Sequence, residues 1–169
     1  MKPIEGLSVL VTGGGSGIGE GIAQFYIERG AKVTICGRRQ DKIDAVAARL
    51  GERCLAVQAD ITTEEDRREA VQMAVTHGGK LDVLVSNAGN MIRGDIDTLR
   101  EDSLVDIFKT NVIAGMLLTG LCKPHLAKNG GAIIFIGSIH TRRAFPGASA
   151  YAATKGALET LTRVLAAEL

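Results

Sequence analysis

Short apolar segments alternate with helical segments along this 169-residue sequence. The apolar segments are continuous, as expected for strands buried on both faces of a sheet. Neighbouring parallel strands need crossover connections, so the alternation predicts βαβ units and a doubly wound α/β sheet with helices on both faces. The expected strands are residues 8–11, 32–36, 54–58, 81–85 and 132–136, and the expected helices are 17–29, 41–50, 62–77, 101–125 and a last one starting near 150.

Local signals set several of these helix boundaries. Gly30 and Gly51 are expected to end the first two helices. Thr62 and Glu65 have the spacing of a capping box for the third helix. Pro124 is expected to disturb the long helix near its end. Because no linker or repeat interrupts the pattern, we expect a single domain spanning residues 1–169.

Composition narrows the range of functions. The net charge is +1, which gives no electrostatic reason to expect nucleic acid or an anionic membrane as a partner. The three cysteines cannot all pair and show no C-x-x-C spacing, which favours a reducing compartment and argues against a disulfide framework or a zinc ribbon. No metal site is expected, because His77, His125 and His140 share no metal-ligand spacing. The apolar stretch from Val112 to Cys122 is shorter than the ~20 residues of a membrane span. We expect a soluble cytoplasmic protein.

A glycine-rich loop follows the first predicted strand. Glycines let backbone N–H groups approach a pyrophosphate, and the following helix N-terminus favours its charge. The spacing is G-x-x-x-G-x-G, without the Lys-Ser or Lys-Thr of a P-loop. A glycine-rich turn without a ligand is the alternative. The residues expected to bind the cofactor here are Thr12, Gly13, Gly15, Ser16, Gly17, Ile18 and Gly19.

Tyr151 and Lys155 open the last predicted helix, one turn apart on the same face. A free phenol, with a pKa of about 10, is a poor acid–base group at neutral pH. An ammonium about 4 Å away stabilises the phenolate by roughly 4 kcal/mol at an effective dielectric of ~20. The pair is therefore suited to general acid–base catalysis, although Tyr-x-x-x-Lys also occurs by chance on surface helices.

Ser138 follows the fifth predicted strand, at the edge where open α/β sheets place their ligand crevice. Its hydroxyl is suited to stabilise charge on a substrate carbonyl oxygen. A nucleophilic serine is the rival interpretation. The sequence around Ser138 lacks the G-x-S-x-G elbow of hydrolases, so a hydrolase is disfavoured.

Taken together, these motifs resemble those of the short-chain dehydrogenase/reductase family over the whole sequence. The resemblance implies a Rossmann-like sheet with strand order 3-2-1-4-5 and a nicotinamide cofactor. Ser86-Asn87-Ala88-Gly89 is similar to the family's N-N-A-G motif, with Ser86 in place of the first asparagine. The further cofactor-binding residues that it implies are Asp60, Ile61, Asn87, Ala88, Gly89, Tyr151 and Lys155.

The resemblance also implies a catalytic set and a mechanism. Tyr151 exchanges the proton of the carbonyl or alcohol, and Ser138 polarises the carbonyl. Lys155 lowers the pKa of the phenol and binds the nicotinamide ribose. Asn111 holds a water that links Lys155 to solvent, or is only a helix-kink residue. The expected function is hydride transfer between the nicotinamide and a small carbonyl or secondary alcohol.

Arg38 indicates which cofactor is preferred. In NAD-binding sheets an acidic residue about 20 positions after the glycine loop binds the ribose 2′-OH. The second predicted strand instead ends in Cys36-Gly37-Arg38-Arg39, without a carboxylate. An arginine here can bind a 2′-phosphate through charge-assisted bonds, so NADP(H) is expected over NAD(H). Alternatively, Arg38 only stacks on the adenine and both cofactors bind.

Two other functions remain open. The first is a catalytically idle dinucleotide sensor or scaffold of the same fold; the complete Ser138, Tyr151 and Lys155 set argues against it. The second is an assembly module, which is compatible with an enzyme. The helix from Ala150 to Leu169 is apolar around most of its circumference, which predicts a homodimer or homotetramer formed through it and the long Asn111 helix.

The family pattern extends beyond Leu169, with two further strands, a Pro-Gly turn and a helical lid. The sequence is therefore expected to be a fragment or the ordered portion of a longer enzyme; a naturally short variant completed by another subunit is the alternative. On this expectation the 169-residue chain alone binds NADP weakly and turns over little substrate.

Overall fold

A computed structural model describes residues 3–169 of the protein. Within them, five parallel strands form one sheet in the order β3-β2-β1-β4-β5, which confirms the predicted topology. The strands are β1 (Ser8–Thr12), β2 (Lys32–Gly37), β3 (Cys54–Gln58), β4 (Val83–Ser86) and β5 (Ala132–Phe135). The helices are α1 (Gly17–Ile27), α2 (Gln40–Leu50), α3 (Glu64–Gly78), α4 (Glu101–Phe108), α5 (Ala114–Asn129) and α6 (Ser149–Glu168).

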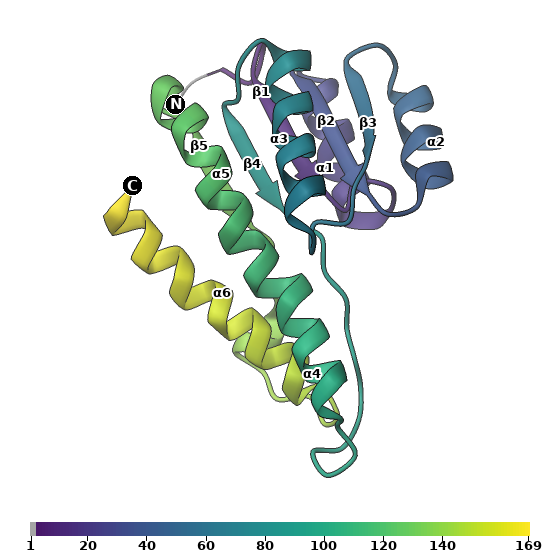
Figure 1. Cartoon of the computed structure of the whole chain (residues 1–169), viewed down its shortest axis with the longest axis vertical. Helices are drawn as coiled ribbons and strands as arrows, with labels where there is room; N and C mark the ends of the chain where they lie inside the picture. The colour runs from purple at the N-terminus through teal and green to yellow at the C-terminus, as the bar shows by residue number, and fades with distance from the viewer. Residues whose placement is uncertain (1–2) are drawn as a thin grey trace.

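Helices cover both faces of the sheet (Figure 1). Successive residues of a strand point to opposite faces, so β1 contributes to two separate cores. Val9 and Val11 pack with Ala23 of α1 on one face, whereas Leu10 packs with Leu118 of α5 on the other. All five side chains are fully buried. The continuous apolar character of β1 therefore reflects burial on both sides.

The β5 strand differs from β1, because it lies at an edge of the sheet in the part of the chain that the structure describes. Ala132 and Ile134 are exposed, and Ile133 and Phe135 are only partly buried. The expectation that every strand is buried on both faces is therefore wrong for β5. Its apolar residues alone do not reveal this, because burial depends on which elements cover them.

The predicted cap of α3 is wrong by one residue. The N-cap is Thr63, whose hydroxyl accepts a hydrogen bond from the N–H of Asp66 at 3.4 Å. Thr62 lies in the preceding turn, where its N–H donates to the carboxylate of Asp60 at 3.0 Å. Adjacent threonines offer the same capping chemistry, and the turn at Asp60 selects the second of them.

The long helix is disturbed at Asn111 instead of Pro124. Pro124 lies within α5, which continues to Asn129. Between α4 and α5, residues Lys109–Ile113 form a π-helical turn that carries Asn111. Such turns are frequent at functional sites, because the inserted residue changes the direction of the side chains that follow.

The continuous helical stretch Glu101–Asn129 contains an 18-residue window with a mean hydropathy of 1.4, so by length and composition alone it could cross a membrane. The expectation that this region is too short to span considered only Val112 to Cys122 and is corrected by this finding. The buried face of α5, including Leu118, Cys122 and Leu126, packs against the sheet. Part of the apolar character of the stretch therefore belongs to the protein core.

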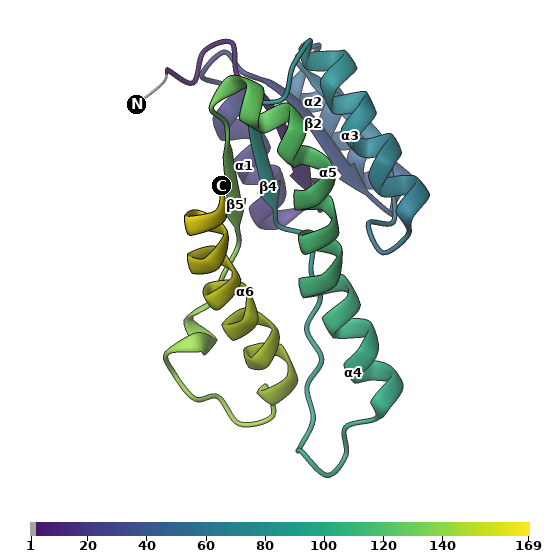
Figure 2. The same ribbon diagram turned by 60° about the vertical axis from the view of Figure 1, so that its left-hand side comes forward.

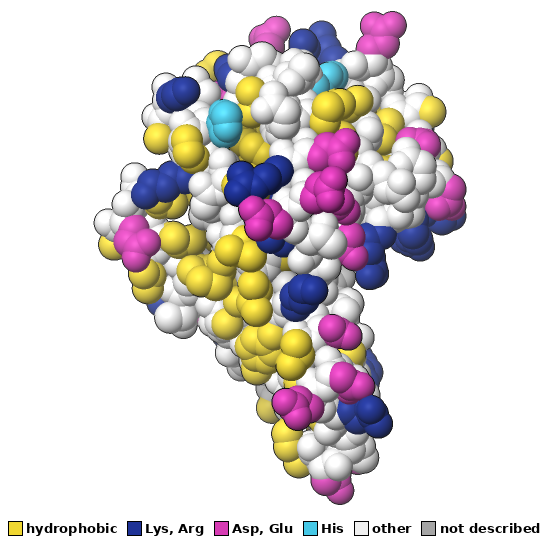
Figure 3. Space-filling model, in the orientation of Figure 1, with side chains coloured by type: hydrophobic (Ala, Val, Ile, Leu, Met, Phe, Trp, Pro, Cys, Tyr) yellow, Lys and Arg dark blue, Asp and Glu magenta, His cyan; other side chains and the backbone are white. Residues whose placement is uncertain are grey.

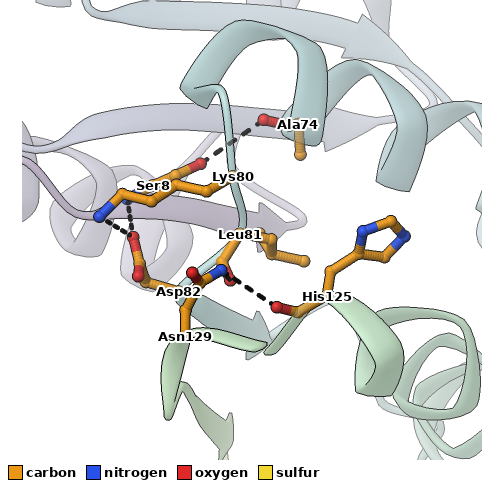
Figure 4. A network of polar contacts seen from close by, with 7 residues as sticks. All are labelled: Ser8, Ala74, Lys80, Leu81, Asp82, His125 and Asn129. Carbon is orange, nitrogen blue, oxygen red and sulfur yellow. Dashed lines mark hydrogen bonds and ion pairs between the residues drawn. The ribbon is translucent and has the colours of Figure 1, made fainter. Parts of the chain in front are cut away.

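A polar network fixes the amino-terminal edge of the sheet (Figure 4). The carboxylate of Asp82, only 4% exposed, accepts a hydrogen bond from the N–H of Ser8 at 2.9 Å and pairs with Lys80 at 3.0 Å. The side-chain amide of Asn129 donates to the carbonyl of Leu81 at 3.2 Å. These contacts join the start of β1, the start of β4 and the end of α5.

Candidate active site

A cleft of about 480 Å³ lies at the carboxyl-terminal edge of the sheet, opposite the Asp82 network. The expected site residues that line it are Gly13, Gly15, Ser16, Ile18, Arg38, Asp60, Ile61, Asn87, Ala88, Gly89, Tyr151 and Lys155. Those outside its lining are Thr12, Gly17, Gly19, Asn111 and Ser138. Residues not expected in the lining include Cys36, Arg39, Lys42, Ile43, Asn90, Met91, Thr110 and Ile136.

The glycine loop places backbone atoms that carry no side chains at one end of this cleft. Gly13 has a φ of +67°, and a Cβ there would lie 2.9 Å from the Cα of Ala88. A Cβ at Gly19 would overlap the carbonyl oxygen of Gly13, so α1 approaches the loop closely only because this residue has no side chain. The first N–H groups of α1 lack intrahelical acceptors, which makes this end suited to an anionic group.

Thr12 and Asn87 lock the ends of β1 and β4 together beneath the cleft. The buried hydroxyl of Thr12 accepts hydrogen bonds from the N–H groups of Asn87 at 3.0 Å and Ala88 at 2.9 Å. The amide of Asn87 donates to the carbonyls of Thr12 at 2.8 Å and Gly13 at 3.2 Å. Thr12 thus holds the loop in position from below.

Three cationic side chains, Arg38, Arg39 and Lys42, line the cleft near the tip of β2. The guanidinium of Arg39 donates to the hydroxyl of Ser16 at 3.4 Å, which links β2 to the glycine loop. Asp60 lines the same cleft. Burial opposes the ionisation of its carboxyl group, but hydrogen bonds from Thr62 and the charge of Arg38 lower its pKa overall. Arg39 and Lys42 were not expected here, although their position at the start of α2 was a usable signal.

Lys155 and Tyr151 line the other end of the cleft. Lys155 is buried, and its ammonium donates to the carbonyl of Ile136 at 2.8 Å. The same nitrogen lies 5.6 Å from the centre of the Tyr151 ring. Burial lowers the pKa of Lys155. The one-turn spacing therefore brings the ammonium beside the phenol ring.

Asn111 lies behind the cleft, where its side chain is buried and hydrogen-bonded through both its nitrogen and its oxygen. The amide nitrogen donates to the carbonyl of Asn90 at 2.9 Å and to the hydroxyl of Thr154 at 3.1 Å. The amide oxygen accepts from the N–H of Asn90 at 2.9 Å. The π-helical turn thus connects the segment after β4 with α6, next to Lys155.

Ser138 lies in an adjoining hollow of about 510 Å³, which shares Lys155 with the main cleft. It caps the 3₁₀ turn Ile139–Thr141, and its hydroxyl accepts a hydrogen bond from the N–H of His140 at 3.2 Å. The ring nitrogen Nδ1 of His140 lies 3.0 Å from the same hydroxyl oxygen. The His140 ring also contacts Tyr151, with 5.2 Å between ring centres. His140 is not among the residues that the sequence predicts for the site.

Comparison with known proteins identifies the family. The model of the short chain dehydrogenase family matches residues 8–169, nearly the whole chain. The chain belongs to this family. A hydroxynaphthalene reductase of Aspergillus fumigatus is 35% identical over 98% of the chain and 62% of its own length. A 3-phenylpropionate-dihydrodiol/cinnamic acid-dihydrodiol dehydrogenase of Shigella sonnei is 34% identical over 100% of the chain and 64% of its own length.

Solved structures of short-chain dehydrogenases share the fold closely. A 3-ketoacyl-(acyl-carrier-protein) reductase of Brucella melitensis, complexed with NADH, has a TM-score of 0.95 and 37% identity over 98% of this chain and 71% of its own. A short-chain dehydrogenase/reductase of Caenorhabditis elegans with cofactor has a TM-score of 0.92 and 31% identity, covering 99% of this chain and 66% of its own. The chain thus spans 62–64% of the length of the two curated relatives named above.

Proposed function

We propose that residues 1–169 form a single dinucleotide-binding domain of an NADP(H)-dependent oxidoreductase acting on a carbonyl or secondary alcohol. The observation that carries the proposal is that one cleft joins a glycine loop, a cluster of three cations and the Tyr151–Lys155 pair. These groups suit the phosphates at one end and acid–base chemistry at the other. The relatives' printed names, reductase and dehydrogenase, agree with this reaction class.

Each catalytic side chain has a proposed role. Tyr151 donates the proton to the carbonyl oxygen during reduction and removes it from the alcohol during oxidation. Lys155 stabilises the phenolate and holds the nicotinamide ribose. Ser138 donates a hydrogen bond to the carbonyl oxygen. The nicotinamide, when bound, supplies or accepts the hydride. Asn111 holds a water that links Lys155 to solvent as a proton relay.

The preference for NADP(H) rests on the charges near β2. Three cations and one carboxylate line that end of the cleft, so a 2′-phosphate gains more than a 2′-hydroxyl does. The Brucella melitensis reductase was solved with NADH, so NAD(H) is the cofactor against which the affinity for NADP(H) should be compared.

Turnover tests the reaction class and separates an enzyme from an idle sensor. The full-length protein is mixed with NADPH and a panel of ketones, and the loss of the reduced nicotinamide is followed optically. Ketone-dependent oxidation is expected, and it is expected to be weak for the 169-residue chain alone. Tight NADPH binding without turnover of any ketone, aldehyde or alcohol by the full-length protein would favour the sensor.

We further propose a soluble, cytoplasmic homodimer or homotetramer formed through α4, α5 and α6. Apolar side chains gather along these helices on the face shown in Figure 3. Val105, Ile113, Met116, Leu117 and Val164 are each 46–57% exposed. An exposed apolar surface of this kind suits a second copy of the chain. Light scattering at micromolar concentration tests it, and a monomeric mass contradicts it.

A further inference from the structure

Among residues 3–169, His140 uses its imidazole for polar contact with one residue, Ser138. Its backbone N–H donates to the Ser138 hydroxyl oxygen at 3.2 Å, and its Nδ1 atom lies 3.0 Å from that oxygen. The ring is held by Phe145, with 4.3 Å between ring centres, and by Tyr151, at 5.2 Å. The position of the ring is therefore set by aromatic packing on two sides.

Counting protons limits what Ser138 can do. A serine hydroxyl has one hydrogen to donate and two lone pairs to accept with. The backbone N–H of His140 uses one lone pair. If Nδ1 is unprotonated, Ser138 donates its only hydrogen to the ring and has none for a substrate oxygen. If Nδ1 carries the proton, Ser138 accepts two hydrogen bonds and its own hydrogen remains available.

The other ring nitrogen favours the second arrangement. Nε2 of His140 is buried and has no hydrogen-bond partner among residues 3–169. When Nδ1 is unprotonated, neutral imidazole carries its hydrogen on Nε2, which here becomes a buried donor without an acceptor. Proteins rarely leave buried N–H donors unpaired and tolerate unused acceptor lone pairs more readily. An unprotonated Nε2 with an unused lone pair is therefore less costly at this buried position than an Nε2–H group without an acceptor.

We propose that His140 is a positioning residue that holds its proton on Nδ1. The Ser138 hydroxyl then accepts from His140 and keeps its own hydrogen for donation to the substrate. With both lone pairs of the hydroxyl oxygen occupied, its hydrogen is directed to the carbonyl or alcohol oxygen of the substrate. The consequence for the substrate rests on the proposed function. The tautomer itself does not, because it follows from contacts within the chain.

Nitrogen-15 NMR of the histidine rings tests the tautomer directly. The chain has three histidines, so few signals need assignment; His140→Asn removes one set, and His77→Asn serves as the control. The expected spectrum shows a protonated Nδ1 and an unprotonated Nε2 for His140. A proton on Nε2, in a neutral or a cationic ring, overturns the proposal. This measurement is decisive even if the protein reduces no ketone.

Turnover tests the consequence for Ser138 in the full-length protein. His140→Asn keeps a side-chain N–H close to the Nδ1 position, whereas His140→Leu removes it. We expect His140→Leu to lower kcat roughly tenfold to a hundredfold, with the KM for NADPH unchanged, and His140→Asn to restore most of that loss.

A double-mutant cycle excludes a merely structural effect. In a Ser138→Ala background the hydroxyl that His140 positions is absent, so His140→Leu is expected to lower kcat no further. An equal loss in both backgrounds would show that His140 acts by some route other than Ser138. Failure of the wild-type protein to turn over any substrate would instead reject the proposed function and leave the NMR result to decide the tautomer.

Discussion

The amino-terminal edge of the sheet differs from the carboxyl-terminal edge in what its polar groups bind. Asp82 at the first edge is almost completely buried, and its carboxylate pairs with Ser8 and Lys80 of the same chain. At the second edge, Arg38 makes no side-chain hydrogen bond or ion pair closer than 4 Å within residues 3–169, and it lines an open cleft. Both edges carry charged side chains beside β-strands, and those at the second edge, Arg38, Arg39 and Lys42, line a cleft.

This difference distinguishes polar residues that stabilise the fold from those that are available to bind a ligand. A buried charge without a partner is costly, so partners within the chain mark the Asp82 network as structural. Cations that line a cavity instead remain available for a ligand. Thr12 lies between these two cases, because it belongs to the carboxyl-terminal edge but its hydroxyl binds the backbone N–H groups of Asn87 and Ala88 beneath the cleft. Substitutions at the two edges are therefore expected to change different properties.

Tyr151→Phe is expected to have the largest effect, and only on activity. Loss of the phenolic hydroxyl removes the proposed general acid–base group, so kcat of the full-length protein should fall about 10²–10⁴-fold. The free energy of unfolding should change by about 0.5 kcal/mol or less. Tyr26→Phe is the matched control, since Tyr26 packs on Phe25 away from the cleft. Turnover within threefold of wild type would remove Tyr151 from the proposed mechanism.

Asp82→Ala is expected to have the opposite profile. The substitution leaves the buried N–H of Ser8 without its side-chain acceptor and should lower the free energy of unfolding by about 2–4 kcal/mol. NADP affinity of the folded protein should not change. The exposed pair of Asp102 with Arg100 provides the control, and Asp102→Ala should lower the free energy of unfolding much less than Asp82→Ala does. Chemical denaturation measures both, and equal losses would show that burial of Asp82 contributes nothing.

Cys36 lies where the cleft floor meets the core, and it should give a smaller, pH-dependent effect. Burial raises the pKa of its thiol from 9.0 to about 12. The folded protein therefore keeps this proton above pH 9 while the unfolded chain releases it. The stabilisation is complete below pH 9 and is lost as the pH rises towards 12, by about 1.4 kcal/mol at pH 10.

Comparing wild type with Cys36→Ala isolates this effect. The free energy of unfolding of each is measured between pH 8 and pH 10. The variant should lose less stability over this interval, whatever its stability at pH 8. Parallel curves would mean that the Cys36 thiol ionises equally in the folded and unfolded states.

The sheet was predictable because each strand and crossover helix leaves its own pattern in the sequence. The strands and the glycine loop were therefore found, and the strand order followed from the family resemblance, whereas details that depend on packing were not found. The π-helical turn at Asn111 accompanies tertiary bonds to Asn90 and Thr154 that no local pattern encodes. The expected role of Asn111 in holding a water stays a prediction.

In the site, too, residues with a local sequence signal were predictable and residues defined by packing were not. Arg38 was identified from the residue type at a strand end, and Arg39 and Lys42 could have been found by extending that argument into the next helix. His140 could not be found from sequence, because its importance depends on contacts with Ser138, Phe145 and Tyr151 that form only in the folded chain. Motif spacing thus predicts the groups that face a ligand better than those that position them.

A calorimetric titration with NADP and NAD tests most directly whether the carboxyl-terminal cleft is a dinucleotide site that selects the 2′-phosphate. We expect NADP to bind at least about tenfold more tightly at low salt, and the difference to shrink as salt screens the cations. Gly37→Asp combined with Arg38→Ala should reverse the preference; a Cβ at position 37 would lie 3.3 Å from Cγ2 of Ile43. Equal affinities of the wild-type protein for NADP and NAD, independent of salt, would contradict the assignment.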